Sequence, residues 1–173
     1  MKTKAVRLYG ANDIRLEKFD LPEMGDDEIL AKVVSDSVCM STHKAVLQGA
    51  AHARVPSDVA ENPTIMGHEF CGEILAVGKK WQDQFKPGDG FAIQPALGWQ
   101  GKLDAPGYSY RYVGGNSQYG IIPNEVMECN CCFVMTTIPI STALLQSLFP
   151  VLLQAIIRIT IPTIRPICMR WVS

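Results

Sequence analysis

The chain has 173 residues, and its 16 lysines and arginines against 17 aspartates and glutamates give a formal net charge of −1. A near-neutral charge provides no general attraction to nucleic acid or to anionic lipid, so we expect neither as a partner. With 47% apolar and 19% charged residues, the chain can bury the core of one ordinary domain but is too short for two. The N-terminal residues MKTKAVRLYG lack the apolar core of a signal peptide, and the six cysteines are unevenly spread. We therefore expect a cytoplasmic protein with reduced thiols.

Several short strands separated by turn signals follow one another along the first three quarters of the chain. Alternating apolar residues predict strands at residues 4–9, 14–17, 28–35, 70–77, 91–94 and 118–122. Residues 41–48 alone predict a short helix. This pattern favours a mainly β fold, a small, curved and partly open β barrel with short helices. The pair Gly114-Gly115 does not belong to a G-x-G-x-x-G motif, so the sequence predicts no Rossmann dinucleotide site in this chain.

The composition changes sharply near residue 132. All 17 acidic residues and all 14 glycines lie in residues 1–132, whereas 133–173 contain eight isoleucines and four prolines. The most apolar stretch, residues 143–157, is interrupted by Pro150 and is shorter than the roughly 20 residues that a membrane helix needs. We therefore divide the chain into a domain at 1–132 and an irregular, poorly ordered apolar tail at 133–173, and expect no membrane span.

A shift of the reading frame offers one hypothesis for this tail. Met135 and Thr136 are encoded by ATG and ACN, and a frame that begins at the third base reads GAC, an aspartate codon. The same shift turns neighbouring Thr/Ile codon pairs into codons for polar residues. The alternatives are a divergent tail and a true hydrophobic anchor.

Cys39, His68 and Glu69 are the strongest candidates for chemistry. Cys39 follows one predicted strand, and His68-Glu69 precede the next, so the three can meet at one rim of a barrel. Thiolate, imidazole and carboxylate suit Zn²⁺, and three protein ligands with one exchangeable position are typical of a catalytic site. Taken from these residues alone, a buried structural cysteine and an ordinary core or surface histidine explain the pattern better than a metal site does.

Longer motifs around these residues resemble a known family. VCMS at 38–41, GHEFCGEI at 67–74 followed by VG at 77–78, and FKPGD at 85–89 are similar to the zinc-dependent medium-chain alcohol dehydrogenases. The resemblance covers residues 1 to about 132, the GroES-like catalytic domain of that family. It implies an oxidoreductase that uses zinc and NAD(P) to act on a polyol or sugar phosphate. The resemblance is compatible with a homo-oligomer but does not specify one.

The resemblance also implies roles for individual residues. Cys39 and His68 would be zinc ligands, and Glu69 a neighbouring or exchanging carboxylate that tunes the site. Ser41 would relay the proton of the zinc-bound alcohol, although it could equally be the N-cap of the helix that follows. Lys44 stands where many relatives carry a relay histidine, and we expect it to be a solvated helix residue or to face a phosphate. His43 and His52 have no supporting partner and are expected to be surface residues.

Three departures from the family limit the prediction. Residues 91–122 contain no cysteine, so no structural zinc is expected, and Cys129-Asn130-Cys131-Cys132 is too tightly spaced for one tetrahedral site. The remaining catalytic ligand of relatives lies where this chain turns apolar, so the zinc site is expected to be incomplete. The 41 residues after 132 are far fewer than the roughly 130 of a Rossmann domain. We therefore expect a truncated enzyme, inactive alone; the alternatives are a non-enzymatic GroES-like binding module and a tail-anchored remnant.

Overall fold

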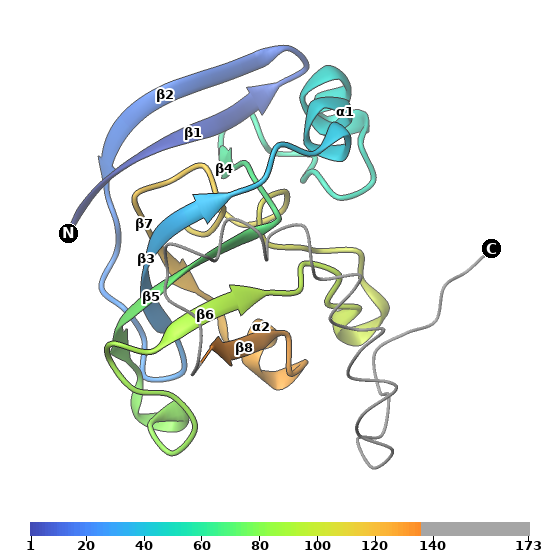
Figure 1. Cartoon of the computed structure of the whole chain (residues 1–173). Coiled ribbons are helices and arrows are strands. Elements are labelled where there is room, and N and C mark those ends of the chain that lie inside the picture. The colour runs from blue at the N-terminus through green and yellow to red at the C-terminus, as the bar shows by residue number, and fades with distance from the viewer. Residues whose placement is uncertain (136–173) are drawn as a thin grey trace.

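The computed structural model describes residues 1–135, and the predicted tail beyond them lies outside the described residues. In this part of the chain strands dominate and the helices are short (Figure 1). The strands are β1 (Lys2–Gly10), β2 (Asp13–Asp20), β3 (Ile29–Asp36), β4 (Thr64–Ile65), β5 (Phe70–Val77), β6 (Gly90–Ile93), β7 (Tyr119–Ile122) and β8 (Cys132–Met135). The helices are α1 (Met40–Gln48), α2 (Asn124–Glu128) and the 3₁₀ turns η1 (Gly49–Ala51), η2 (Lys79–Trp81) and η3 (Trp99–Gly101).

Two antiparallel sheets make up the β structure. One has the order β2-β1-β4 and the other the order β7-β3-β5-β6-β8. Contacts near the start of the chain join them, because the amide of Val6 donates to the carbonyl of Asn116 at 2.8 Å and Ala5 forms a bridge with Ser117. The described fold is therefore the mainly β, incompletely closed arrangement that the sequence predicts.

The main core lies against the five-stranded sheet. The inward side chains of β3 and β6 meet those of β5 there, and Ile29, Ile74 and Phe91 are fully buried. Burying an aliphatic or aromatic side chain of this size contributes about 1.5–3 kcal/mol. A second cluster around Leu8, Met66 and Tyr108 packs beneath α1 and holds the helix against the sheets.

Glycine at position 72 lets β5 sit close to its neighbour. A Cβ at this position would overlap the backbone carbonyl of Lys32 in β3 and would also press on the ring of Phe91. The glycine of the GHEFCGEI motif therefore has a packing role, because it allows β3 and β5 to pair along their whole length.

Strand β8 crosses the composition boundary at residue 132. Its four residues pair with β6 in antiparallel register, from Cys132 opposite Ile93 to Met135 opposite Gly90. The sheet thus includes the first three residues of the predicted tail.

Candidate metal centre

The pairing of β3 with β5 brings the three candidate ligands together. Asp36, the last residue of β3, lies opposite Phe70, the first residue of β5. Cys39 follows β3 by three residues, and His68 and Glu69 directly precede β5. Because the strands are antiparallel, the end of one and the start of the other lie at the same edge of the sheet. This register places residues that are distant in the sequence side by side.

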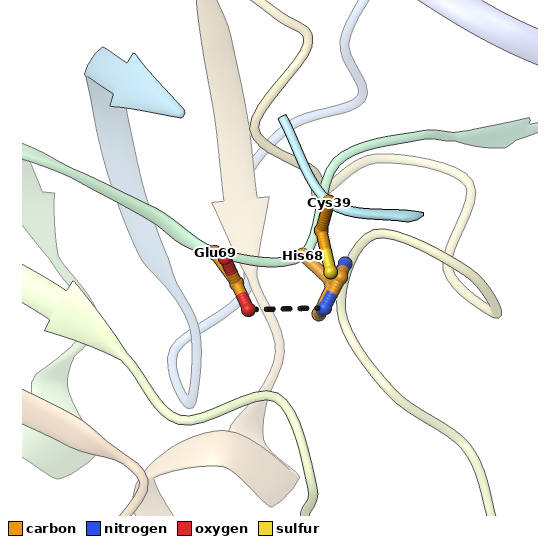
Figure 2. A group of neighbouring side chains, drawn as sticks. All are labelled: Cys39, His68 and Glu69. Carbon is orange, nitrogen blue, oxygen red and sulfur yellow. Dashed lines mark ion pairs between the residues drawn. The ribbon is translucent and has the colours of Figure 1, made fainter. Parts of the chain in front are cut away.

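The donor atoms of Cys39, His68 and Glu69 face a common point (Figure 2). The thiol sulfur, an imidazole nitrogen and a carboxylate oxygen all lie within 4.8 Å of one another. His68 is buried, while Cys39 and Glu69 are half-buried. Ligands of one tetrahedral Zn²⁺ are separated by about 3.5 Å, and zinc accepts these three donor types. The residues therefore fit a zinc ion after a small inward shift of the side chains.

The two ring nitrogens of His68 have different surroundings. Nε2 lies 3.6 Å from Glu69 Oε1 and 3.3 Å from Ser41 Oγ, on the side of the other candidate ligands. Nδ1 lies 3.1 Å from the hydroxyl of Thr42 and 3.0 Å from that of Tyr108. If Nε2 binds a metal, Nδ1 carries the ring proton and donates it to these hydroxyl oxygens, which fixes the ring orientation.

Ser41 lies at the centre of a hydroxyl network. Its Oγ accepts a hydrogen bond from Tyr108 at 3.0 Å and lies 2.9 Å from the sulfur of Cys39. Cys39, and not Ser41, is the N-cap of α1, and no side chain caps that helix. The alternative role of Ser41 as an N-cap is therefore wrong, because α1 begins one residue earlier and leaves the Ser41 hydroxyl to the site.

Burial sets the protonation preferences of the site. Burial lowers the pKa of His68, an effect that the Glu69 carboxylate opposes and the Arg54 charge reinforces. The ring thus favours the neutral form, which is the form that binds a metal. Burial also raises the pKa of Tyr108, so its hydroxyl remains a hydrogen-bond donor.

Glu69 is held by the segment that leads to Cys39. The hydroxyl of Ser37 donates to Glu69 Oε2, and the amide of Ser37 donates to the Glu69 carbonyl at 3.0 Å. One carboxylate oxygen is thereby anchored, while Oε1 remains directed toward His68. Glu69 therefore has one oxygen available to a metal ion.

Asp36 lies behind the ligands. Burial raises the pKa of its carboxyl to about 7, although the backbone amides of Ser37 and Glu69 lower it, and Oδ1 is buried without a hydrogen-bond partner. Gly67 and Gly115 leave the room that this carboxyl occupies, because a Cβ on either would overlap it. The glycine of the GHE motif is thus explained by the space that the Asp36 carboxyl needs behind the candidate ligands.

Cys39 and Thr42 also line a pocket of about 280 Å³ between the end of β3, α1 and the hairpin of β1 and β2. Ile14 and Asn116 contribute to its walls. One side of the candidate ligand cluster is therefore reached through a hollow that is large enough for several water molecules.

The other residues that the sequence singled out lie in different places. Lys44 and His43 are exposed on α1. The expectation that His52 has no partner is wrong: its ring stacks on Tyr108 with centroids 5.6 Å apart, and its Nδ1 accepts a hydrogen bond from the Arg54 amide. In the described residues, metal-compatible groups of three or more side chains comprise only Cys39, His68 and Glu69.

Sequence reasoning did not identify Thr42, Tyr108, Ser37 and Asp36 as parts of the site. Thr42 lies one helical turn after Cys39, a spacing that could have indicated it. Tyr108 comes from a loop forty residues from His68 and carries no local signal. Its place in the site follows from tertiary packing alone.

No helix in the described part of the chain is long and apolar enough to cross a membrane.

Comparisons with known proteins agree with this geometry. Residues 25–129 match the alcohol dehydrogenase GroES-like domain family. The L-sorbose 1-phosphate reductase of Klebsiella pneumoniae is 57% identical over 129 residues, which cover 75% of this chain and 32% of that protein. The mannitol-1-phosphate 5-dehydrogenase of Aliivibrio fischeri is 47% identical over 130 residues, covering 75% of this chain and 30% of that protein.

A solved structure shows the same fold. The 2R,3R-butanediol dehydrogenase of Bacillus subtilis superposes with a TM-score of 0.63 at 26% identity, over 78% of this chain and 41% of that one. The chain spans about a third of the length of the curated relatives that it matches. The family resemblance of the VCMS, GHEFCGEI and FKPGD motifs is confirmed, and this chain belongs to the alcohol dehydrogenase GroES-like domain family.

Proposed function

We propose that residues 1–132, together with strand β8, form the zinc-binding catalytic domain of an NAD(P)-dependent dehydrogenase that acts on a sugar phosphate or polyol phosphate. The observation that carries this proposal is the convergence of Cys39, His68 and Glu69 within 4.8 Å. The hydroxyl of Ser41 lies beside two of them, at 2.9 Å from the thiol and 3.3 Å from the ring. A metal cluster with an adjacent proton carrier is what alcohol oxidation and carbonyl reduction require.

In this mechanism Cys39, His68 and Glu69 hold the ion. Bound zinc would supply a Lewis acid for the substrate oxygen, and a nicotinamide would supply or accept hydride. Tyr108 donates to Ser41 Oγ, so the Ser41 proton is directed toward the ligand side of the network. Ser41 is therefore placed to exchange a proton with a substrate oxygen, while Thr42 and Tyr108 keep the His68 ring in position.

The substrate class is inferred from the relatives. The matched reductase and dehydrogenase are named for L-sorbose 1-phosphate and mannitol 1-phosphate, and both are more than 45% identical over the catalytic segment. Both names specify a phosphorylated six-carbon sugar or polyol. We assign the same class to this chain.

We further propose that the 173-residue chain does not turn over alone. It spans about a third of the length of its relatives, and its match to them is confined to 129–131 residues. An assay with NADH or NADPH and L-sorbose 1-phosphate is expected to give no rate above the enzyme-free blank. A measurable rate would contradict this part of the proposal.

Cobalt substitution tests the metal-site proposal directly. Co²⁺ added to the metal-free chain should produce a thiolate-to-cobalt absorption band, which Cys39→Ser should abolish. His43→Ala is the control, because His43 is an exposed histidine on α1, the helix that directly follows Cys39, and should leave the band unchanged. A band that survives Cys39→Ser, or no band in the unmodified chain, would refute the site.

A further inference from the structure

We propose that Arg54, assisted by Lys44 and His52, forms an anion subsite beside the metal centre that binds the phosphate group of the substrate. The inference rests on the proposed function and adds to it the residues that select a phosphorylated substrate.

Arg54 is a positioned cation without a counter-ion. Its Nη1 donates to the carbonyl of Leu103 at 2.8 Å, and its own carbonyl accepts a hydrogen bond from Ser109 Oγ at 2.7 Å. The side chain is half-buried, and within residues 1–135 neither Arg54 nor Lys44 forms an ion pair with a carboxylate. A guanidinium that is partly removed from water gains most from an anion that returns charge and hydrogen bonds to it.

A continuous series of contacts leads from Arg54 to the metal ligands. The Arg54 amide donates to His52 Nδ1 at 3.2 Å, and the His52 ring stacks on Tyr108 with an interplanar angle of 12°. The hydroxyl of Tyr108 then lies 3.0 Å from His68 Nδ1. The backbone of Arg54 is thereby joined to the metal centre through the rings of His52 and Tyr108.

Two positive charges act on the side chains at this place, although Glu69 acts in the opposite sense on His68 and Cys39 on Tyr108. The charge of Arg54 acts on His52, Tyr108 and His68, and the charge of Lys44 acts on His52 as well. These side chains come from three segments of the chain: α1, the loop after η1 and the loop that contains Tyr108. The two positive charges come from Lys44 on α1 and Arg54 in the loop after η1, and Tyr108 contributes a neutral ring between them and His68.

The chemistry of a phosphorylated sugar fits this arrangement. In a ketose 1-phosphate the phosphate ester is on the carbon next to the carbonyl carbon. When the carbonyl oxygen lies at the metal centre, the phosphate must bind within about one side chain of it. A planar guanidinium offers paired donors for phosphate oxygens, whereas an uncharged polyol gains nothing from them. Arg54 would thus favour a phosphorylated substrate over the corresponding free sugar or polyol.

The test compares D-sorbitol 6-phosphate with D-sorbitol as probes of the zinc-loaded, full 173-residue chain. Dissociation constants come from amide and guanidinium NMR shifts during titration. We expect at least a tenfold preference for the phosphorylated probe, with shifts at the Arg54 Nε–H. Arg54→Gln should remove most of that preference and leave sorbitol binding unchanged. Arg15→Gln, which changes an exposed arginine paired with Asp13, is the matched control and should keep the preference.

Two further variants keep the test decisive if Arg54→Gln does not fold. Arg54→Lys should retain more than half of the preference, and Lys44→Gln on exposed α1 should reduce it two- to threefold. An unchanged preference in Arg54→Gln would overturn the subsite. If that variant does not fold, a preference that is lost in Arg54→Lys or unchanged in Lys44→Gln would overturn it.

Zinc uptake separates this inference from the proposed function. Uptake that depends on Cys39, combined with phosphate binding that ignores Arg54, would reject the subsite and leave the metal centre intact. Phosphate binding that depends on Arg54 in a chain that takes up no zinc would support the anion site and reject the proposed function.

Discussion

Replacing Asp36 by asparagine should change how stability depends on pH. Burial raises the pKa of this carboxyl from 3.8 to about 7. Between these two values the folded state binds more protons than the unfolded state, so the free energy of unfolding falls as the pH rises through this window. One pKa unit corresponds to 1.36 kcal/mol, so the shift sets an upper limit of about 4 kcal/mol between pH 4 and pH 8. Because the carboxyl is half-buried, solvent screening reduces this limit, and we expect about 2–3 kcal/mol.

The measurement is urea unfolding of the metal-free chain and of Asp36→Asn at pH 4.5, 6 and 8. The asparagine variant cannot ionise, so its free energy of unfolding relative to the unmodified chain should increase by about 2–3 kcal/mol from pH 4.5 to pH 8. Asp83→Asn, an exposed aspartate in the turn after η2, is the control and should show no such trend. If the difference in free energy of unfolding between Asp36→Asn and the unmodified chain stays constant with pH, the argument that burial disfavours the charged form of Asp36 is refuted.

The remaining predictions concern the neighbours of the metal centre. Gly67→Ala should lower the free energy of unfolding by about 3 kcal/mol or more in denaturant unfolding, because Gly67 has φ of 92° and a Cβ would overlap Asp36. A loss below about 1 kcal/mol, the ordinary effect of a point substitution, would contradict this. Tyr108→Phe should keep the ring packing but weaken zinc binding about tenfold in chelator competition, because His68 loses a hydroxyl partner; an unchanged affinity would show that the hydroxyl does not position the ring. Zinc at about 100 times its dissociation constant should stabilise the chain by about 2.7 kcal/mol in the same unfolding experiment, and no stabilisation would mean that the folded state does not bind it.

Strands with clear alternation were predictable from the sequence. The predicted strand at 70–77 coincides with β5, and the helix predicted at 41–48 differs from α1 by one residue. β4 has two residues and was not predicted, because so short a segment shows no period and forms only by pairing with β1. The last three residues of β8, 133–135, were assigned to the tail, because the composition changes near residue 132 and these apolar residues show no alternation.

The convergence of the three candidate ligands was predictable because it depends on residue type and on adjacency to strands. Cys39, His68 and Glu69 lie beside the ends of two strands whose pairing was a reasonable expectation. The contacts of Tyr108 and His52 were not predictable, because they arise where a loop folds back on α1 and the ring stack is set by packing. The carboxyl of Asp36 reads as an ordinary polar strand end in the sequence, and only the glycines that surround it reveal its burial.

Zinc binding by the whole chain is the most direct test of the central claim that Cys39, His68 and Glu69 form a metal centre. The metal-free protein should bind one equivalent of Zn²⁺ in competition with a chromophoric chelator. His68→Ala should weaken this binding at least tenfold. His43 is an exposed histidine outside the cluster, and His43→Ala should leave the binding unchanged. No binding by the unmodified chain, or equal affinity in His68→Ala, would contradict the account.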